Sequence, residues 1–221
     1  RYPAVHMPYL PNLASPNDEI YGKSVSILTA ELDRCGALHI PYLVTHLGSH
    51  LGRGEMFGLK RIIEACSRAL SEVDNDVMIL LENTAGTKNS VGSTFENLRY
   101  VSGNVEPDRR VGICFDTSHA FAAGYDLRSD EDVDRSLGLL DDIIGLDKVK
   151  VVHLNDSKGA FNSHSDRHDH IGLGYIGEDG FRAFLRHKLA KTRPLVMETP
   201  VDSRRDDVGN LKKVRELAGE G

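Results

Sequence analysis

Short apolar runs alternate along the chain with longer amphipathic segments. The runs are rich in Val, Ile and Leu and too short for typical helices, which is the pattern of parallel strands buried on both faces. We predict six strands, at residues 3–6, 40–46, 77–82, 111–116, 149–153 and 195–198.

The segments after the strands carry apolar residues at the three- and four-residue spacing of a helix face. Val25, Leu28, Leu32 and Cys35 show this spacing, and we expect Gly36 to stop that helix. The same pattern predicts helices around Leu59 and Leu70, Phe95 and Val101, Val133 and Ile144, Phe181 and Leu185, and Val208 and Val214.

Alternating strands and helices predict an α/β fold with a parallel sheet and right-handed crossovers. The chain has no Pro/Gly/Ser-rich linker, so we predict one domain over residues 1–221. Periodicity fits both an open doubly wound sheet and part of a (β/α)8 barrel.

The polar residues favour the barrel, because every predicted strand ends in a residue type that binds metals. Barrel strands converge at their carboxyl ends on one active face, whereas an open sheet binds ligands at a switch point served by fewer strands. One such residue alone is usually a cap or a loop residue. Six together predict a metal site formed by His6, His46, Glu82, Asp116, His153 and Glu198.

Two loop motifs add ligand types. His119 follows Asp116 by three residues, and Asp166 and His168 form a D-x-H pair. We assign His164 and His170 to solvent or supporting positions. Imidazole and carboxylate donors without thiolate suit zinc, and also manganese or iron. Nine ligands fit three ions that share a bridging carboxylate, an arrangement suited to phosphodiester hydrolysis.

Composition narrows the picture further. Hydrophobic residues make up 40% and charged residues 27%, as in ordinary globular proteins. The net charge of −6 argues against a general nucleic-acid binder unless bound cations dominate the active face. Cys35, Cys66 and Cys114 lack C-x-x-C spacing, so we predict buried thiols rather than a cysteine zinc site. We see no leader or spanning segment and expect a cytoplasmic protein.

Six strings in the chain resemble endonuclease IV, in the order found in that family. They are HLGSH (46–50), LENTAG (81–86), FDTSHAFAAGYDL (115–127), HLNDSK (153–158), DRHDHIGLG (166–174) and ETP (198–200). The resemblance covers nearly the whole chain and implies a (β/α)8 TIM barrel. The family pattern places two further βα units before residue 3, so we expect an N-terminally truncated barrel whose first and last strands each have one open edge.

The resemblance also implies roles for residues. His6, His46 and Glu82 would hold one zinc, and Glu82 would bridge to a second zinc. Asp116, His153 and Glu198 would complete the second site, and His119, Asp166 and His168 would hold the third. Glu82, Asp116 and Glu198 are the expected catalytic carboxylates. Tyr9 would enter the DNA at the lesion, and the candidate phosphate contacts are Arg53, Lys88, Arg128, Lys158 and Arg167.

The implied reaction is hydrolysis of the phosphodiester 5′ to an abasic site in double-stranded DNA, which leaves a 3′-hydroxyl and a 5′-deoxyribose phosphate. We expect a DNA-repair enzyme with three zinc ions, partly replaceable by Mn²⁺ or Fe²⁺, and a monomer when full length. One alternative is a metal-dependent sugar isomerase or epimerase of the same barrel superfamily, which uses one or two ions. The other is an inactive DNA-binding remnant.

Overall fold

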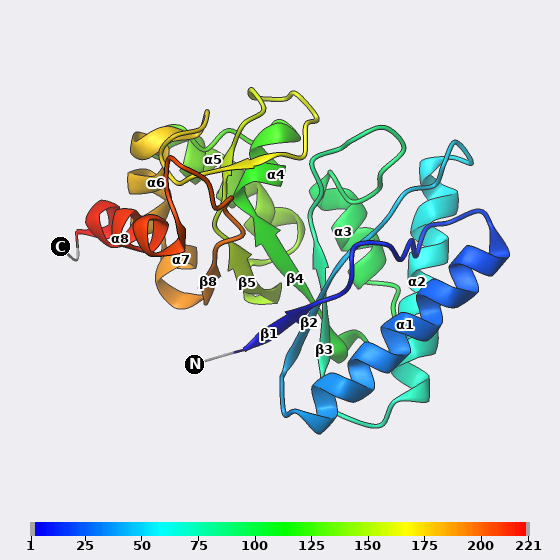
Figure 1. The fold of residues 1–221 in the computed structure, drawn as a ribbon. Helices are drawn as coiled ribbons and strands as arrows, with labels where there is room; N and C mark the ends of the chain where they lie inside the picture. The colour runs from blue at the N-terminus through cyan, green and yellow to red at the C-terminus, as the bar shows by residue number, and fades with distance from the viewer. Residues whose placement is uncertain (1–2, 220–221) are drawn as a thin grey trace. The chain divides into compact units, whose positions relative to one another are not determined.

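The computed structural model describes residues 3–219 (Figure 1). These residues form two compact units. The first unit runs to Thr84 and resumes over Lys88–Cys114, and the second comprises Ala85–Thr87 and the residues from Phe115 onward. The prediction of a single domain stays a prediction.

The first unit is built on parallel strands. β1 (Ala4–His6), β2 (Tyr42–His46), β3 (Met78–Glu82) and β4 (Val111–Asp116) pair in that order, and β4 continues past Cys114 into the second unit. In the register of β2 and β3, His46 lies directly opposite Glu82. The pairing therefore brings two predicted ligands together at the carboxyl edge of these strands.

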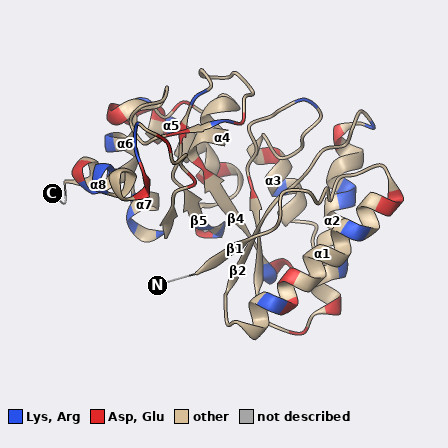
Figure 2. Ribbon diagram, viewed as in Figure 1, with Lys and Arg blue, Asp and Glu red and all other residues tan. Residues whose placement is uncertain are grey.

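Three helices of the first unit follow the predicted apolar faces: α1 (Asp18–Ala37), α2 (Glu55–Glu72) and α3 (Phe95–Ser102). The Asn17 side chain accepts a hydrogen bond from the Ile20 amide and so caps α1. α1 and α2 lie side by side (Figure 1). Acidic and basic residues are interspersed along both helices (Figure 2), and the exposed side chains of Lys23 and Glu19 form an ion pair.

The predicted stop at Gly36 is wrong, because α1 continues to Ala37 and Leu38 is its C-cap. Gly36 is needed for a different reason. A Cβ at this position would lie 2.4 Å from Nδ2 of Asn75, whose side chain donates to the Leu32 carbonyl over 3.0 Å. The glycine therefore lets the last turn of α1 approach the segment before β3.

The second unit contains the parallel strands β5 (Val149–His153) and β8 (Leu195–Val196) and the short antiparallel pair β6 (Asp156–Ser157) and β7 (His168–Asp169). Its predicted helices are α5 (Asp130–Ile143), α6 (Gly177–Arg186) and α8 (Asp207–Ala218). Periodicity did not reveal the shorter elements of the chain: α4 (Thr117–Ala122), α7 (Lys188–Thr192), the 3₁₀ turns η1 (Asp108–Arg110) and η2 (Leu146–Lys148), and the strands β6 and β7.

The last predicted strand is shorter than expected. β8 ends at Val196, so Glu198 lies beyond the strand and not at its end. The Glu198 amide donates over 2.7 Å to the side-chain oxygen of Asn155 instead of joining a strand ladder. In its unit β8 has one strand partner, β5, and β1 likewise has one, β2. Val196 is 40% exposed, in line with an edge strand.

The parallel strands and intervening helices confirm the predicted α/β class. All three cysteines are buried, as predicted, and none forms a disulfide: Cys35 lies in α1, Cys66 in α2 and Cys114 in β4. Among the described residues, no helix is both long and apolar enough to cross a bilayer.

Candidate metal centre and nucleic-acid surface

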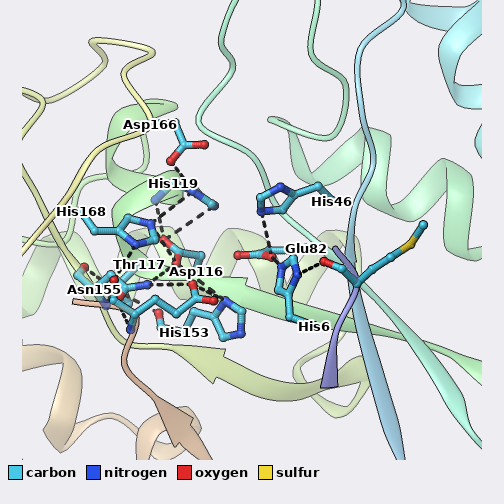
Figure 3. A network of polar contacts seen from close by, with 12 residues as sticks. His6, His46, Glu82, Asp116, Thr117, His119, His153, Asn155, Asp166 and His168 are labelled. Atoms are coloured by element: carbon cyan, nitrogen blue, oxygen red, sulfur yellow. Dashed lines mark hydrogen bonds and ion pairs between the residues drawn. The ribbon is translucent and has the colours of Figure 1, made fainter. Parts of the chain in front are cut away.

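The first unit brings three predicted ligands together at the ends of β1, β2 and β3; we call them the first cluster. Nε2 of His6 lies 3.0 Å and Nε2 of His46 lies 3.2 Å from the same oxygen, Oε2 of Glu82 (Figure 3). Glu82 is fully buried, and the two imidazoles are about one-third exposed. The buried carboxylate thus sits beneath two rings that solvent can reach.

The second unit brings together Asp116, His153 and Glu198, the second cluster. Nδ1 of His153 lies 3.1 Å from Oε2 of Glu198 and 4.0 Å from Oδ2 of Asp116. Each residue offers one ligand atom, and these atoms all lie within 4.8 Å of one another. Asp116 and His153 are buried, and the Glu198 side chain is 36% exposed.

The third cluster comprises Asp116, His119 and His168, with Asp166 beside them. Oδ1 of Asp166 lies 3.0 Å from Nε2 of His119, and Nε2 of His168 lies 3.4 Å from that same nitrogen (Figure 3). His168 Nε2 also lies 3.7 Å from Oδ2 of Asp116. Asp116 therefore contributes to two clusters of the second unit.

Local structure explains the spacing of Asp116 and His119. Asp116 ends β4 and is also the N-cap of α4, and its Oδ1 accepts the His119 amide over 2.7 Å. One helical turn then returns the His119 ring to the face of the capping carboxylate. The β6–β7 pair, together with the loop between these strands, brings Asp166 and His168 to the same place.

The donors fit divalent cations. His6 donates its Nδ1 proton to the carbonyl of the next residue over 2.7 Å, and its Nε2 faces Oε2 of Glu82, where a neutral ring would offer its lone pair to a cation. His168 Nδ1 similarly contacts the Glu198 carbonyl at 3.3 Å, and its Nε2 faces Nε2 of His119. Two ring nitrogens at this distance repel unless a proton or a cation lies between them. Imidazole nitrogens with carboxylate oxygens are the donors that zinc, manganese and iron take in proteins.

Sequence reasoning did not find Asn155, which connects the second cluster. Its Nδ2 donates to Oδ2 of Asp116 over 2.7 Å, and its Oδ1 accepts the Glu198 amide over 2.7 Å. Its backbone amide donates to Thr117 Oγ1 over 2.9 Å. Asn155 is fully buried, so its side-chain amide holds the carboxylate of one predicted ligand, Asp116, and the backbone of another, Glu198.

Asp156, also missed, holds the loop after β7. Its buried carboxylate accepts backbone amides from Gly172, Gly174 and Ile176 at 2.9–3.0 Å. Burial raises the pKa of this carboxyl, and these hydrogen bonds act in the opposite direction. A Cβ on Gly174 would lie 2.4 Å from the Ser157 carbonyl, so the loop can approach β6 only with glycine there.

The remaining predicted histidines differ in their surroundings. His170 is fully buried, with Nε2 2.9 Å from Asp202 and Nδ1 2.9 Å from the Asn210 amide. The hydrogen bonds from His170 and Arg204 lower the pKa of Asp202 well below its usual range, the bond from Arg204 more strongly. His164 is exposed and contacts the Ala85 carbonyl at 3.3 Å.

The predicted DNA-contacting residues are exposed. Tyr9 is 85% exposed and its neighbour Leu10, which sequence reasoning missed, is 89% exposed. Such a pair of large apolar side chains on one loop is available to a partner. All five candidate phosphate contacts are exposed: Arg53, Lys88, Arg128, Lys158 and Arg167. Among them Arg128 forms an ion pair with Asp126 at 2.6 Å.

The chain is similar to a known family of barrel proteins. The chain matches the xylose isomerase-like TIM barrel family over residues 2–218. It is 60% identical to the probable endonuclease 4 of Methanoculleus marisnigri and 54% identical to that of Cenarchaeum symbiosum, covering in each case 97% of this chain and 76% of the relative. The structure resembles endonuclease IV from Thermus thermophilus, with a TM-score of 0.84 at 37% identity over 99% of this chain and 76% of that one. The chain belongs to the endonuclease IV family.

Proposed function

We propose that the chain is a DNA-repair endonuclease that hydrolyses the phosphodiester 5′ to abasic sites. Its products would be a 3′-hydroxyl and a 5′-deoxyribose phosphate. The observation that carries the proposal is the 60% identity to a probable endonuclease 4 over 97% of the chain. The retained His and carboxylate clusters support it, because hydrolysis of a stable phosphodiester needs strong charge stabilisation.

The proposed cofactors are about three zinc ions, with Mn²⁺ or Fe²⁺ as partial substitutes. One ion would be held by the first cluster, and one each by the second and third clusters, with Asp166 completing the third. The family resemblance further implies that Glu82 is shared with the second ion. Divalent cations at these positions would lower the pKa of water and neutralise the charge of the phosphodiester.

The side chains have separate tasks in this proposal. Glu82, Asp116 and Glu198 supply the carboxylates that fix the cations, and Asn155 holds the carboxylate of Asp116 and the backbone of Glu198. Their burial or partial burial keeps their geometry rigid before DNA arrives, so little reorganisation is needed during the reaction.

The exposed residues would recognise the lesion. An abasic site leaves a gap in the base stack, and an inserted apolar side chain costs least where no base has to be unstacked. Tyr9 and Leu10 offer such side chains. Arg53, Lys158 and Arg167 would contact phosphates, which fixes the register without reading the sequence.

A sugar isomerase or epimerase of the same superfamily is the rival function. It needs one or two cations, so His119, Asp166 and His168 would have no task in it. The contacts of 3.0 Å and 3.4 Å among these three side chains favour a third cation, and with it the nuclease.

The experiment uses a duplex with one abasic site and a label at each end of the damaged strand. We expect zinc-dependent incision on the 5′ side of the lesion and a product that a polymerase extends, because it carries a 3′-hydroxyl. An intact duplex of the same sequence is the control substrate. Incision 3′ to the lesion, or turnover of a free ketose without incision, would contradict the proposal.

A further inference from the structure

The loop between β6 and β7, residues 158–167, carries Asp166 near its end; we call it the Asp166 loop. The loop is mostly exposed, and the Asp166 side chain is 41% exposed. Yet Oδ1 of Asp166 lies 3.0 Å from Nε2 of His119, and this contact is what brings Asp166 into the third cluster. Something other than burial of Asp166 therefore has to hold the loop in place.

Phe161 attaches this loop to α4. Its ring centroid lies 5.5 Å from that of Phe121, with the planes tilted by 57°, a geometry favourable for aromatic pairs. The Arg128 guanidinium lies 5.4 Å from the Phe161 ring and 5.7 Å from the Phe121 ring. Asp126 fixes that guanidinium with contacts of 2.9 Å to Nε and 2.6 Å to Nη2. The rings of Phe161 and Phe121 and the guanidinium of Arg128 therefore pack together as one group.

The backbone of the loop is tied to the same helix. The Asn162 amide donates to the Phe121 carbonyl over 3.2 Å, and the His164 amide donates to the Ala122 carbonyl over 2.9 Å. Asn162 and His164 adopt φ of 57° and 53°, in the left-handed region that costs about 1 kcal/mol or more for such residues. The loop therefore needs its contacts with α4 to keep this conformation.

The helix that receives Phe161 is also the helix that carries His119, two residues before Phe121. A side chain that fixes the loop on α4 thereby fixes the distance between Asp166 and His119. We propose that Phe161 is a positioning residue of the third cluster: its packing on Phe121 and Arg128 places Asp166 so that the cluster binds its cation. The inference rests on the proposed function only in that the third cluster holds a cation.

Phe161 is 39% exposed, so a direct contact between its ring and DNA is the competing explanation. The two explanations differ in the absence of DNA. A positioning residue changes metal binding and loop mobility of the free protein, whereas a DNA contact changes neither. The test is therefore made without DNA first.

The experiment measures zinc affinity by titration into metal-stripped protein, together with proteolysis within residues 158–167. Phe161→Ala is expected to weaken one zinc by about 10- to 100-fold, to leave the others unchanged, and to speed cleavage of the loop. Asp166→Asn is the positive control and should weaken the same zinc. Phe161→Tyr keeps the ring and should restore wild-type binding. Leu139→Ala, at a similarly exposed apolar residue of α5, is the matched control and should change nothing.

The double variant Phe161→Ala with Asp166→Asn sharpens the test. If Phe161 acts through Asp166, the double variant binds zinc as weakly as Asp166→Asn alone, because the two changes share one effect. Fully additive losses would overturn the proposal. Unchanged zinc binding and loop protection in Phe161→Ala, with weaker binding of an abasic duplex, would overturn it in favour of a DNA contact. Failure of the wild type to incise abasic DNA would overturn the proposed function, while the zinc titration decides the role of Phe161 separately.

Discussion

The side-chain amide of Asn155 donates a hydrogen bond of 2.7 Å to Oδ2 of Asp116, and both side chains are fully buried. The other carboxylate oxygen of Asp116 accepts the His119 amide, also over 2.7 Å. Each oxygen of this predicted ligand therefore accepts a hydrogen bond that helps to orient it. The orientation of the carboxylate depends on a neutral residue that offers no charge of its own.

Asn155→Asp tests the hydrogen bond that Asn155 donates to Asp116 separately from the one that it accepts from the Glu198 amide. The substitution keeps the shape and the acceptor for the Glu198 amide, but it removes the donor and places a second carboxylate beside Asp116. We expect zinc affinity at the second cluster to fall by about 10- to 100-fold. Calorimetric titration of zinc measures this loss, with the exposed Asn104→Asp as control. Wild-type affinity in Asn155→Asp would show that the hydrogen bond does not orient the ligand.

Glu82→Gln tests the carboxylate of the first cluster. The amide fits the same space between His6 and His46 but binds cations poorly, so incision of abasic DNA should fall by on the order of 10²-fold or more. The circular dichroism spectrum should stay that of the wild type. Incision at the wild-type rate would refute a catalytic role for Glu82.

Arg110 is a stability residue of the first unit. Its buried guanidinium donates to the carbonyls of Leu70, Val73 and Val77 at 2.9–3.2 Å and to Oδ1 of Asn75 at 2.8 Å. Arg110→Met removes these four buried hydrogen bonds, so the free energy of unfolding should fall by about 3–5 kcal/mol.

Urea unfolding measures that change, and the neighbouring Arg109 provides the control. The Arg109 side chain is 73% exposed, so Arg109→Met should change the free energy of unfolding by less than about 0.5 kcal/mol. Equal losses in both variants would mean that the buried hydrogen bonds of Arg110 contribute nothing specific.

DNA binding should depend on salt despite the net charge of −6, because each neutralised phosphate releases counterions. Lys158→Ala and Arg167→Ala should each reduce the slope of log affinity against log salt by about 1. Lys148 lies at the opposite end of β5 from the predicted ligand His153, so Lys148→Ala should leave the slope unchanged. Equal slopes in all variants would place the DNA elsewhere.

Much of the fold could be predicted from the sequence, because short apolar runs are typical of buried parallel strands. The strands ending at His46, Glu82, Asp116 and His153 end where the pattern predicts. Glu198 did not, since its amide is taken by the Asn155 side chain, a contact between residues far apart in the sequence. The prediction that Gly36 ends its helix was wrong for the same reason. Its packing against Asn75, a residue far away in the sequence, cannot be predicted from the residues around Gly36.

Six of the predicted ligands stand out in the sequence because they are His, Asp or Glu residues at the ends of apolar runs, and the other three lie in loop motifs. The residues that hold those ligands do not stand out. Asn155 is a neutral amide two residues after a predicted ligand, and Phe161 is an aromatic residue in a polar loop. Their roles depend on partners from other segments, Asp116 for the first and Phe121 with Arg128 for the second. Neither contact can be predicted from periodicity or composition.

The most direct test titrates zinc into metal-stripped protein and measures incision of an abasic duplex at each step. The clusters around Glu82, His153 and His119 predict that incision rises steeply and becomes complete only near about three zinc ions per chain. Full incision at one zinc ion per chain, or zinc binding at all levels without any incision, would contradict this account.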